Sequence, residues 1–68
     1  MSKGIRISSK NFSDVSEALE KSGIDWTVWN AEALMDPNYN GPIDIECQES
    51  CHFEKFLLIV RNAEKRSS

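Results

Sequence analysis

The residue types best suited to metal binding or nucleophilic chemistry lie in one short segment, residues 47–52, whose sequence is CQESCH. Thiolate and imidazole are good zinc ligands, and Glu46 or Glu49 could add a carboxylate oxygen. A structural zinc site usually takes four ligands in two separated pairs, whereas this segment has three candidates and the chain has no second pair. We therefore expect no metal or other cofactor, and keep as an alternative a thiol or metal site at Cys47, Cys51 and His52.

A reactive thiol at Cys51, beside His52 and the start of a helix, is the second chemistry that this segment could support. A nucleophilic dyad requires two side chains that face each other, and adjacent residues on a helix do not. The glycines at positions 4, 23 and 41 are isolated, so the chain has no phosphate-binding loop. We expect Cys47 to be a core residue, Cys51 to begin a helix, and the protein not to be an enzyme.

Charge is distributed unevenly along the chain. The whole chain has 8 Lys and Arg against 11 Asp and Glu, a formal charge of −3. Residues 25–54 contain 7 acids and no Lys or Arg (−7), and the remaining residues contain 4 acids and 8 bases (+4). The mild total argues against a generic nucleic-acid binder, whose domain is basic. The 25–54 segment instead predicts an acidic surface that selects a basic partner and speeds association with it.

A length of 68 residues allows one domain, 1–68, in which 65–68 is expected to be a frayed tail. A chain this short buries only about 60% of its surface on folding, so an efficient core or a second copy must supply stability. A homodimer is therefore one expectation. No segment approaches the roughly 18 apolar residues of a membrane span, and residues 1–4 lead into no signal-peptide apolar region, which predicts a cytoplasmic protein with no membrane partner.

In the first half of the chain, apolar residues alternate with polar ones over residues 5–7, which predicts a short strand. Asn11, Ser13 and Asp14 are candidate caps at the start of a helix, Asp14 and Glu17 fit a capping box there, and Gly23 fits a left-handed cap at its end. Residues 24–29 alternate again and are rich in β-branched and aromatic types, which predicts a second strand.

In the second half, Asn30 could cap a short helix over residues 31–35, which Pro37 prevents from continuing. Residues 43–47 alternate and predict a third strand. Residues 53–64 have helical spacing of apolar side chains but also a continuous apolar run, so a fourth strand is the alternative to the helix that we favour.

These elements predict a small α/β (α+β) domain with a three-stranded sheet, two helices on one face of it, and the order β-α-β-β-α. The other face of such a sheet stays open to solvent or to a partner. The side chains expected on that face are Arg6, Asp25, Thr27, Trp29, Asp44 and Glu46.

The leading hypothesis is a small non-enzymatic regulator or inhibitor that docks through an acidic surface on a basic partner protein. Trp29 is either covered by the loop at residues 30–42 or exposed as a binding anchor, and Tyr39 has the same two interpretations. The expected contact residues are Asp25, Trp29, Asp36, Tyr39, Asp44 and Glu46.

No family motif can be quoted from these residues. In size and charge the chain resembles the small accessory proteins that phages make to inhibit host enzymes, which implies a nucleic-acid-handling enzyme as the basic partner. The alternative is a nucleic-acid-binding module that uses the basic ends of the chain, if these gather on one side. The residues concerned are Lys3, Arg6, Lys10, Lys55, Arg61, Lys65 and Arg66.

Overall fold

The computed structural model describes residues 3–67 and has the predicted order of elements. Its strands and α-helices are β1 (Lys3–Ser8), α1 (Phe12–Ser22), β2 (Trp26–Val28), β3 (Pro42–Cys47) and α2 (Phe53–Ser67). Three 3₁₀ turns connect them: η1 (Ser9–Asn11), η2 (Ala31–Met35) and η3 (Ser50–His52). The expected α+β domain is confirmed, and the alternative of a fourth strand over 53–64 is wrong because this segment is part of α2.

The last strand in the chain is the central strand of the sheet. The strand order is β1-β3-β2, and β3 pairs antiparallel with both neighbours. Ile45 lies opposite Ile5 on one side and Val28 on the other. β1 and β2 come before β3 in the chain but do not pair with each other, because β3 lies between them and pairs with both.

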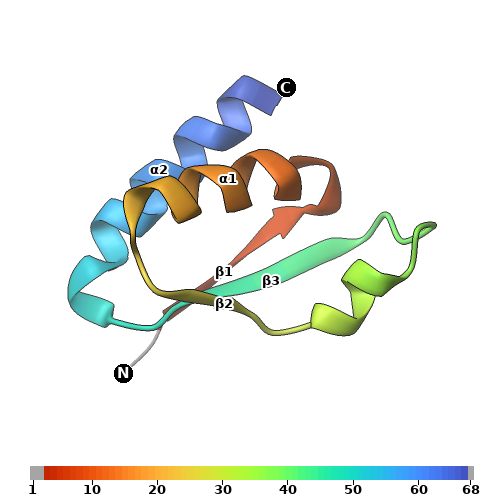
Figure 1. The fold of residues 1–68 in the computed structure, drawn as a ribbon, viewed down its shortest axis with the longest axis horizontal. Coiled ribbons are helices and arrows are strands. Elements are labelled where there is room, and N and C mark those ends of the chain that lie inside the picture. The colour runs from red at the N-terminus through yellow and green to blue at the C-terminus, as the bar shows by residue number, and fades with distance from the viewer. Residues whose placement is uncertain (1–2, 68) are drawn as a thin grey trace.

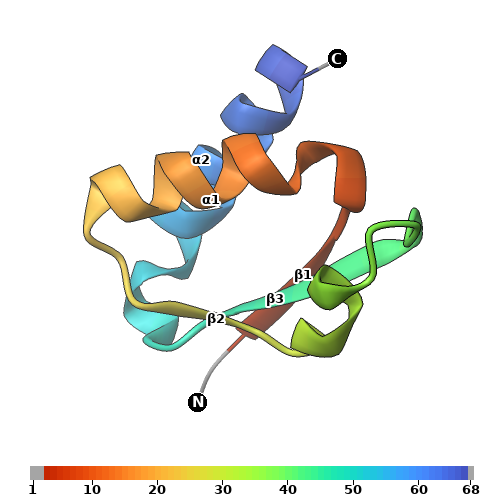
Figure 2. The same cartoon turned by 45° about the vertical axis from the view of Figure 1, so that its right-hand side comes forward.

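Both α-helices cover the same face of the sheet (Figures 1 and 2). Alternation along β3 sends Ile43, Ile45 and Cys47 under the helices, where each is 0% exposed. The helices contribute the remaining apolar layer through positions three and four residues apart, as an amphipathic helix must. The buried core consists of Ile7, Val15, Leu19, Ile24, Ile43, Ile45, Cys47, Phe56, Val60 and Ala63.

Helix α1 begins after Asn11, the first of its three candidate caps. The predicted capping box at Asp14 and Glu17 is wrong, because the helix starts at Phe12 and Asp14 lies within its first turn. The turn η1 leads directly into the helix, and the side chain of Ser8 accepts the Lys10 N–H at 3.3 Å. Phe12 packs against Trp26 with ring centroids 6.1 Å apart, so a long-range aromatic contact stabilises the first turn.

Helix α2 also extends beyond its predicted end. Of the residues expected to form a frayed tail, 65–67 are helical and Ser68 lies outside the described residues. Phe56, Val60 and Ala63 are buried along one stripe, so the apolar face continues almost to the end of the helix. Lys65 and Arg66 lie in the last turn, where positive charge interacts favourably with the helix dipole.

Replacing a buried leucine should cost far more stability than the same change on the surface. We expect Leu19→Ala, at a side chain that is 0% exposed, to lower the free energy of unfolding by about 2–5 kcal/mol in urea titrations. Leu58 is 62% exposed, and Leu58→Ala should change stability by no more than about 0.5 kcal/mol. Equal losses in the two variants would contradict this core.

A substitution of Gly23, the cap at the end of α1, tests the effect of backbone conformation on stability without a change in packing. Gly23 has φ of 77° and nothing within 4 Å of where a Cβ would lie, so only its left-handed conformation resists a side chain. We expect Gly23→Ala to destabilise by about 1 kcal/mol and Gly23→Asn by less, because Asn tolerates this conformation better. Equal stability of wild type and Gly23→Ala by urea unfolding would contradict the assignment.

Candidate functional site

The face of the sheet opposite the helices carries a patch of polar side chains. Asp44 and Glu46 of β3 alternate with the buried residues of that strand and are only partly covered. Arg6 lies opposite Asp44 on one side, and Thr27 lies opposite Glu46 on the other. We call this the open face and define it by Gly4, Arg6, Thr27, Trp29, Asp44 and Glu46.

One ion pair crosses the open face. Arg6 Nε donates to Asp44 Oδ1 at 2.9 Å, directly across the β1–β3 register. The hydrogen bond and charge of Asp44 raise the pKa of Arg6 above its ordinary value. Both side chains are exposed, so the pair contributes little to stability. Its consequence is electrostatic, because it neutralises one of the acids of this face and leaves Glu46 as the outward-facing carboxylate of β3.

A shallow hollow of about 420 Å³ lies beside this ion pair. It is lined by Gly4, Ile5, Arg6, Trp29, Asp44 and Ile45. A Cβ at Gly4 would lie 3.1 Å from the carbonyl oxygen of Ile45, a close contact that glycine avoids. The lining of the hollow therefore combines the ion-paired Arg6 and Asp44 with a tryptophan and a glycine.

Trp29 is 66% exposed, so the loop at residues 30–42 does not cover it. Its backbone N–H donates to Asp44 O at 2.8 Å and continues the β2–β3 pairing beyond Val28. The alternation of β2 places Trp26 inside against Phe12 and sends Trp29 to the other side. A large aromatic side chain is thus held in solvent by an ordered backbone.

Asn30 has a different role from the predicted helix cap. It makes no side-chain cap bond at η2. Instead its Nδ2 donates to Pro42 O at 3.1 Å, and its Oδ1 accepts from Asp44 N at 2.9 Å. The side-chain amide therefore pairs with β3 as a backbone peptide group would. The main chain can leave the sheet for η2 while the hydrogen bonds of β3 remain satisfied.

The structure brings only part of the predicted contact set together. Trp29, Asp44 and Glu46 share the open face, and Asp25 is exposed just before β2. Tyr39 is half-buried against the core and its hydroxyl donates to Pro42 O at 2.6 Å, so it holds the turn before β3. Asp36 is also engaged locally, because its Oδ1 accepts the Asn38 N–H at 2.9 Å.

Sequence reasoning missed two exposed apolar side chains in η2. Met35 is 86% exposed and Leu34 is 44% exposed, in the segment that follows Trp29. The available signal was a pair of adjacent apolar residues in a turn too short to bury both. Apolar groups of this size in solvent are typical of surfaces that bind another molecule.

Arg6 does not share a surface with the basic residues of α2. Arg6 points away from the helices, as its alternation with buried Ile7 requires, and pairs with Asp44. Arg61 is on α2, on the opposite side of the sheet, and pairs with Glu64 at 2.7 Å. Lys3 lies 5.3 Å from the ring centroid of Phe53. The sheet therefore separates Arg6 from the basic residues of α2.

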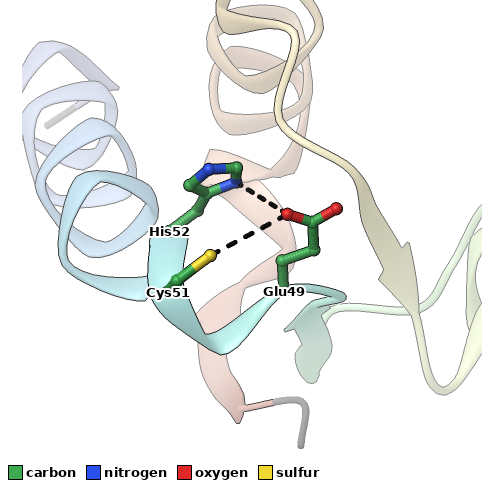
Figure 3. A group of neighbouring side chains, drawn as sticks. All are labelled: Glu49, Cys51 and His52. Carbon is green, nitrogen blue, oxygen red and sulfur yellow. Dashed lines mark hydrogen bonds and ion pairs between the residues drawn. The ribbon is translucent and has the colours of Figure 1, made fainter.

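In the segment at residues 47–52, Cys47 is a core residue as expected, and Cys51 lies in the 3₁₀ turn that leads into α2. Both cysteines are free, and Cys47 is buried with its Sγ donating to Glu49 O at 3.1 Å. Cys51 is exposed, and its Sγ lies 3.9 Å from Glu49 Oε2. His52 Nδ1 lies 3.4 Å from the same carboxylate oxygen (Figure 3). Among the described residues, the cluster of donor atoms is therefore Glu49, Cys51 and His52, and Cys47 is not part of it.

No protein-family model, curated protein or solved structure matches this chain. Within the described part of the chain, no helix is both long enough and apolar enough to cross a membrane.

Removing the side-chain amide of Asn30 should weaken the hydrogen-bonded pairing of the segment around Trp29 with β3. We expect Asn30→Ala to destabilise the fold by about 1–2 kcal/mol through the loss of two hydrogen bonds, and to shift the fluorescence of Trp29. Asn38→Ala is the control, since the side chain of Asn38 is exposed and the hydrogen bond recorded there uses its backbone N–H. The proposed role is wrong if both variants unfold at the same urea concentration with unchanged fluorescence.

Proposed function

We propose that this protein is a non-catalytic regulator or inhibitor that docks its open face on a basic surface of another protein. The observation that carries the proposal is Trp29, 66% exposed and held beside a hollow on an ordered sheet. Tryptophan is among the residues most enriched in binding hot spots, because burial of its large ring excludes much water.

The charges around Trp29 support a basic partner. Asp25, Glu32 and Asp36 are exposed on the chain that flanks Trp29, and Glu46 is on the adjacent strand. The ion pair with Arg6 compensates the charge of Asp44. A surface with this excess of acids attracts a positive partner and repels its own copy, so a face-to-face homodimer would place like charges together.

Basic surfaces of this kind are common on enzymes that handle nucleic acids. An inhibitor of such an enzyme would place carboxylates where phosphates otherwise bind. The size and charge of the chain fit this partner class, and the open face is the surface on which the contact would form. A homodimer through the exposed edge of β1 would leave the open face accessible, and light scattering at high concentration would detect it.

The proposal predicts that two single changes on the open face weaken capture of a partner. Tagged chain incubated with native host extract should retain a protein of basic surface, and added salt should weaken that retention. We expect Trp29→Ala to lower the affinity for that protein by at least about tenfold, and Glu46→Lys to slow association. Leu58→Ala and Glu20→Lys, at exposed positions on the helices, are the matched controls.

Capture that is unchanged in Trp29→Ala and Glu46→Lys, with both variants folded by circular dichroism, would contradict docking through the open face. The nucleic-acid alternative has its own readout, because Arg61, Lys65 and Arg66 are exposed on the last turns of α2. Salt-dependent retention on a DNA or RNA column, lost on triple substitution of these residues by alanine, would favour that function instead.

A further inference from the structure

Three chemically different donors converge in the connection between β3 and α2. The carboxylate of Glu49, the thiol of Cys51 and the imidazole of His52 each offer one atom, and these atoms all lie within 4.8 Å of one another (Figure 3). Glu49 Oε2 is the shared neighbour, 3.4 Å from His52 Nδ1 and 3.9 Å from Cys51 Sγ. All three side chains are exposed, so an ion from solvent can reach them.

The spacing fits the edges of a tetrahedral zinc site. Zinc bonds of about 2.0–2.2 Å to oxygen and nitrogen and about 2.3 Å to sulfur place tetrahedral N and O ligands about 3.4 Å apart, and S and O ligands about 3.6 Å apart. The N–O distance of 3.4 Å already matches, and the S–O distance of 3.9 Å is slightly longer than that edge. The third pair, Cys51 Sγ and the His52 nitrogen, lies within 4.8 Å, and the exposed Cys51 side chain can rotate toward the other two donors.

The backbone that carries these donors is held in place before any ion binds. The carbonyl of Glu49 accepts hydrogen bonds from His52 N at 3.0 Å and from the buried Cys47 Sγ at 3.1 Å. Gln48 N donates to Asp25 O at 3.1 Å, which ties the segment to the chain before β2. Glu49 caps the 3₁₀ turn η3, and the hydrogen bond from His52 N to its carbonyl holds these two residues close together.

We propose that Glu49, Cys51 and His52 form an exposed three-ligand site for a zinc-class divalent cation, with water in the fourth position. A thiolate together with an imidazole selects a borderline-soft ion, whereas Mg²⁺ and Ca²⁺ take oxygen ligands. When the ion binds, the Cys51 S–H bond is replaced by an S–metal bond and the proton leaves to solvent. Cys47 acts only through the backbone of Glu49, as a positioning residue. The site is independent of the open face and of its partner.

The experiment titrates the full chain, purified without chelators and under reducing conditions, with Zn²⁺ by calorimetry and with Co²⁺ by absorption. We expect one ion per chain, an affinity that falls as pH is lowered, and a thiolate-to-Co²⁺ charge-transfer band. Excess Mg²⁺ should not displace the bound Zn²⁺. The ligand variants Cys51→Ser, His52→Ala and Glu49→Gln should each weaken binding of Zn²⁺ by at least about tenfold, and Cys51→Ser should abolish the Co²⁺ band.

Glu54→Gln is the matched control for Glu49→Gln, because Glu54 is an exposed acid that begins the next helix and lies outside the cluster. It should bind Zn²⁺ with the wild-type affinity. All four positions are on the surface, so circular dichroism should show a retained fold in each variant. Absence of saturable Zn²⁺ binding, a Co²⁺ band that survives in Cys51→Ser, or equal losses in Glu49→Gln and Glu54→Gln would each overturn the site.

Discussion

The pairing of β3 with both of its neighbours is the constraint on which the rest of the structure depends. Ile43 and Ile45 lie opposite Ile7 and Ile5, so one face of three strands becomes apolar and can be covered by the two helices. Because side chains alternate along a strand, a slip of one residue would bury Asp44 and expose that apolar set. The same register therefore positions both the core and the open face.

The two candidate sites lie at successive points along this central strand. Near the beginning of β3, the carbonyl of Asp44 accepts the Trp29 N–H. The Asp44 N–H donates to the side chain of Asn30, where a backbone carbonyl would otherwise accept it. After the end of β3, Cys47 anchors the turn that presents the zinc-type donors. At the open face the side chain of Asn30 takes the place of a backbone partner, and after β3 the thiol of Cys47 is a second donor to the Glu49 carbonyl. These hydrogen bonds stabilise the fold and also fix the backbone that carries the exposed functional groups.

Charge separation along the sequence becomes a more mixed pattern in space. The acids of residues 25–54 lie just before β2, in and just after η2, on β3, in the connection to α2 and in the first turn of α2. Arg6 belongs to β1, outside the acidic segment, but lies beside Asp44 because the β1–β3 register pairs these two residues. A count of charges along the sequence cannot contain this pairing, since the two residues are 38 positions apart. The net field of the face therefore depends on Glu46 and the exposed acids near β2.

The sequence by itself determined what short-range spacing controls: alternation in the strands, the apolar stripes of both helices, the left-handed end of α1 at Gly23 and the order of the elements. Only the tertiary structure decided which of the candidate caps begins α1, that Trp29 is exposed while Tyr39 is half-buried, and that Asn30 pairs with β3. It also decided that Glu49 and not Cys47 joins Cys51 and His52. The physical reason is that periodicity records which face of an element is apolar, whereas hydrogen bonds and burial between distant segments depend on strand order and register, which no local window of sequence contains.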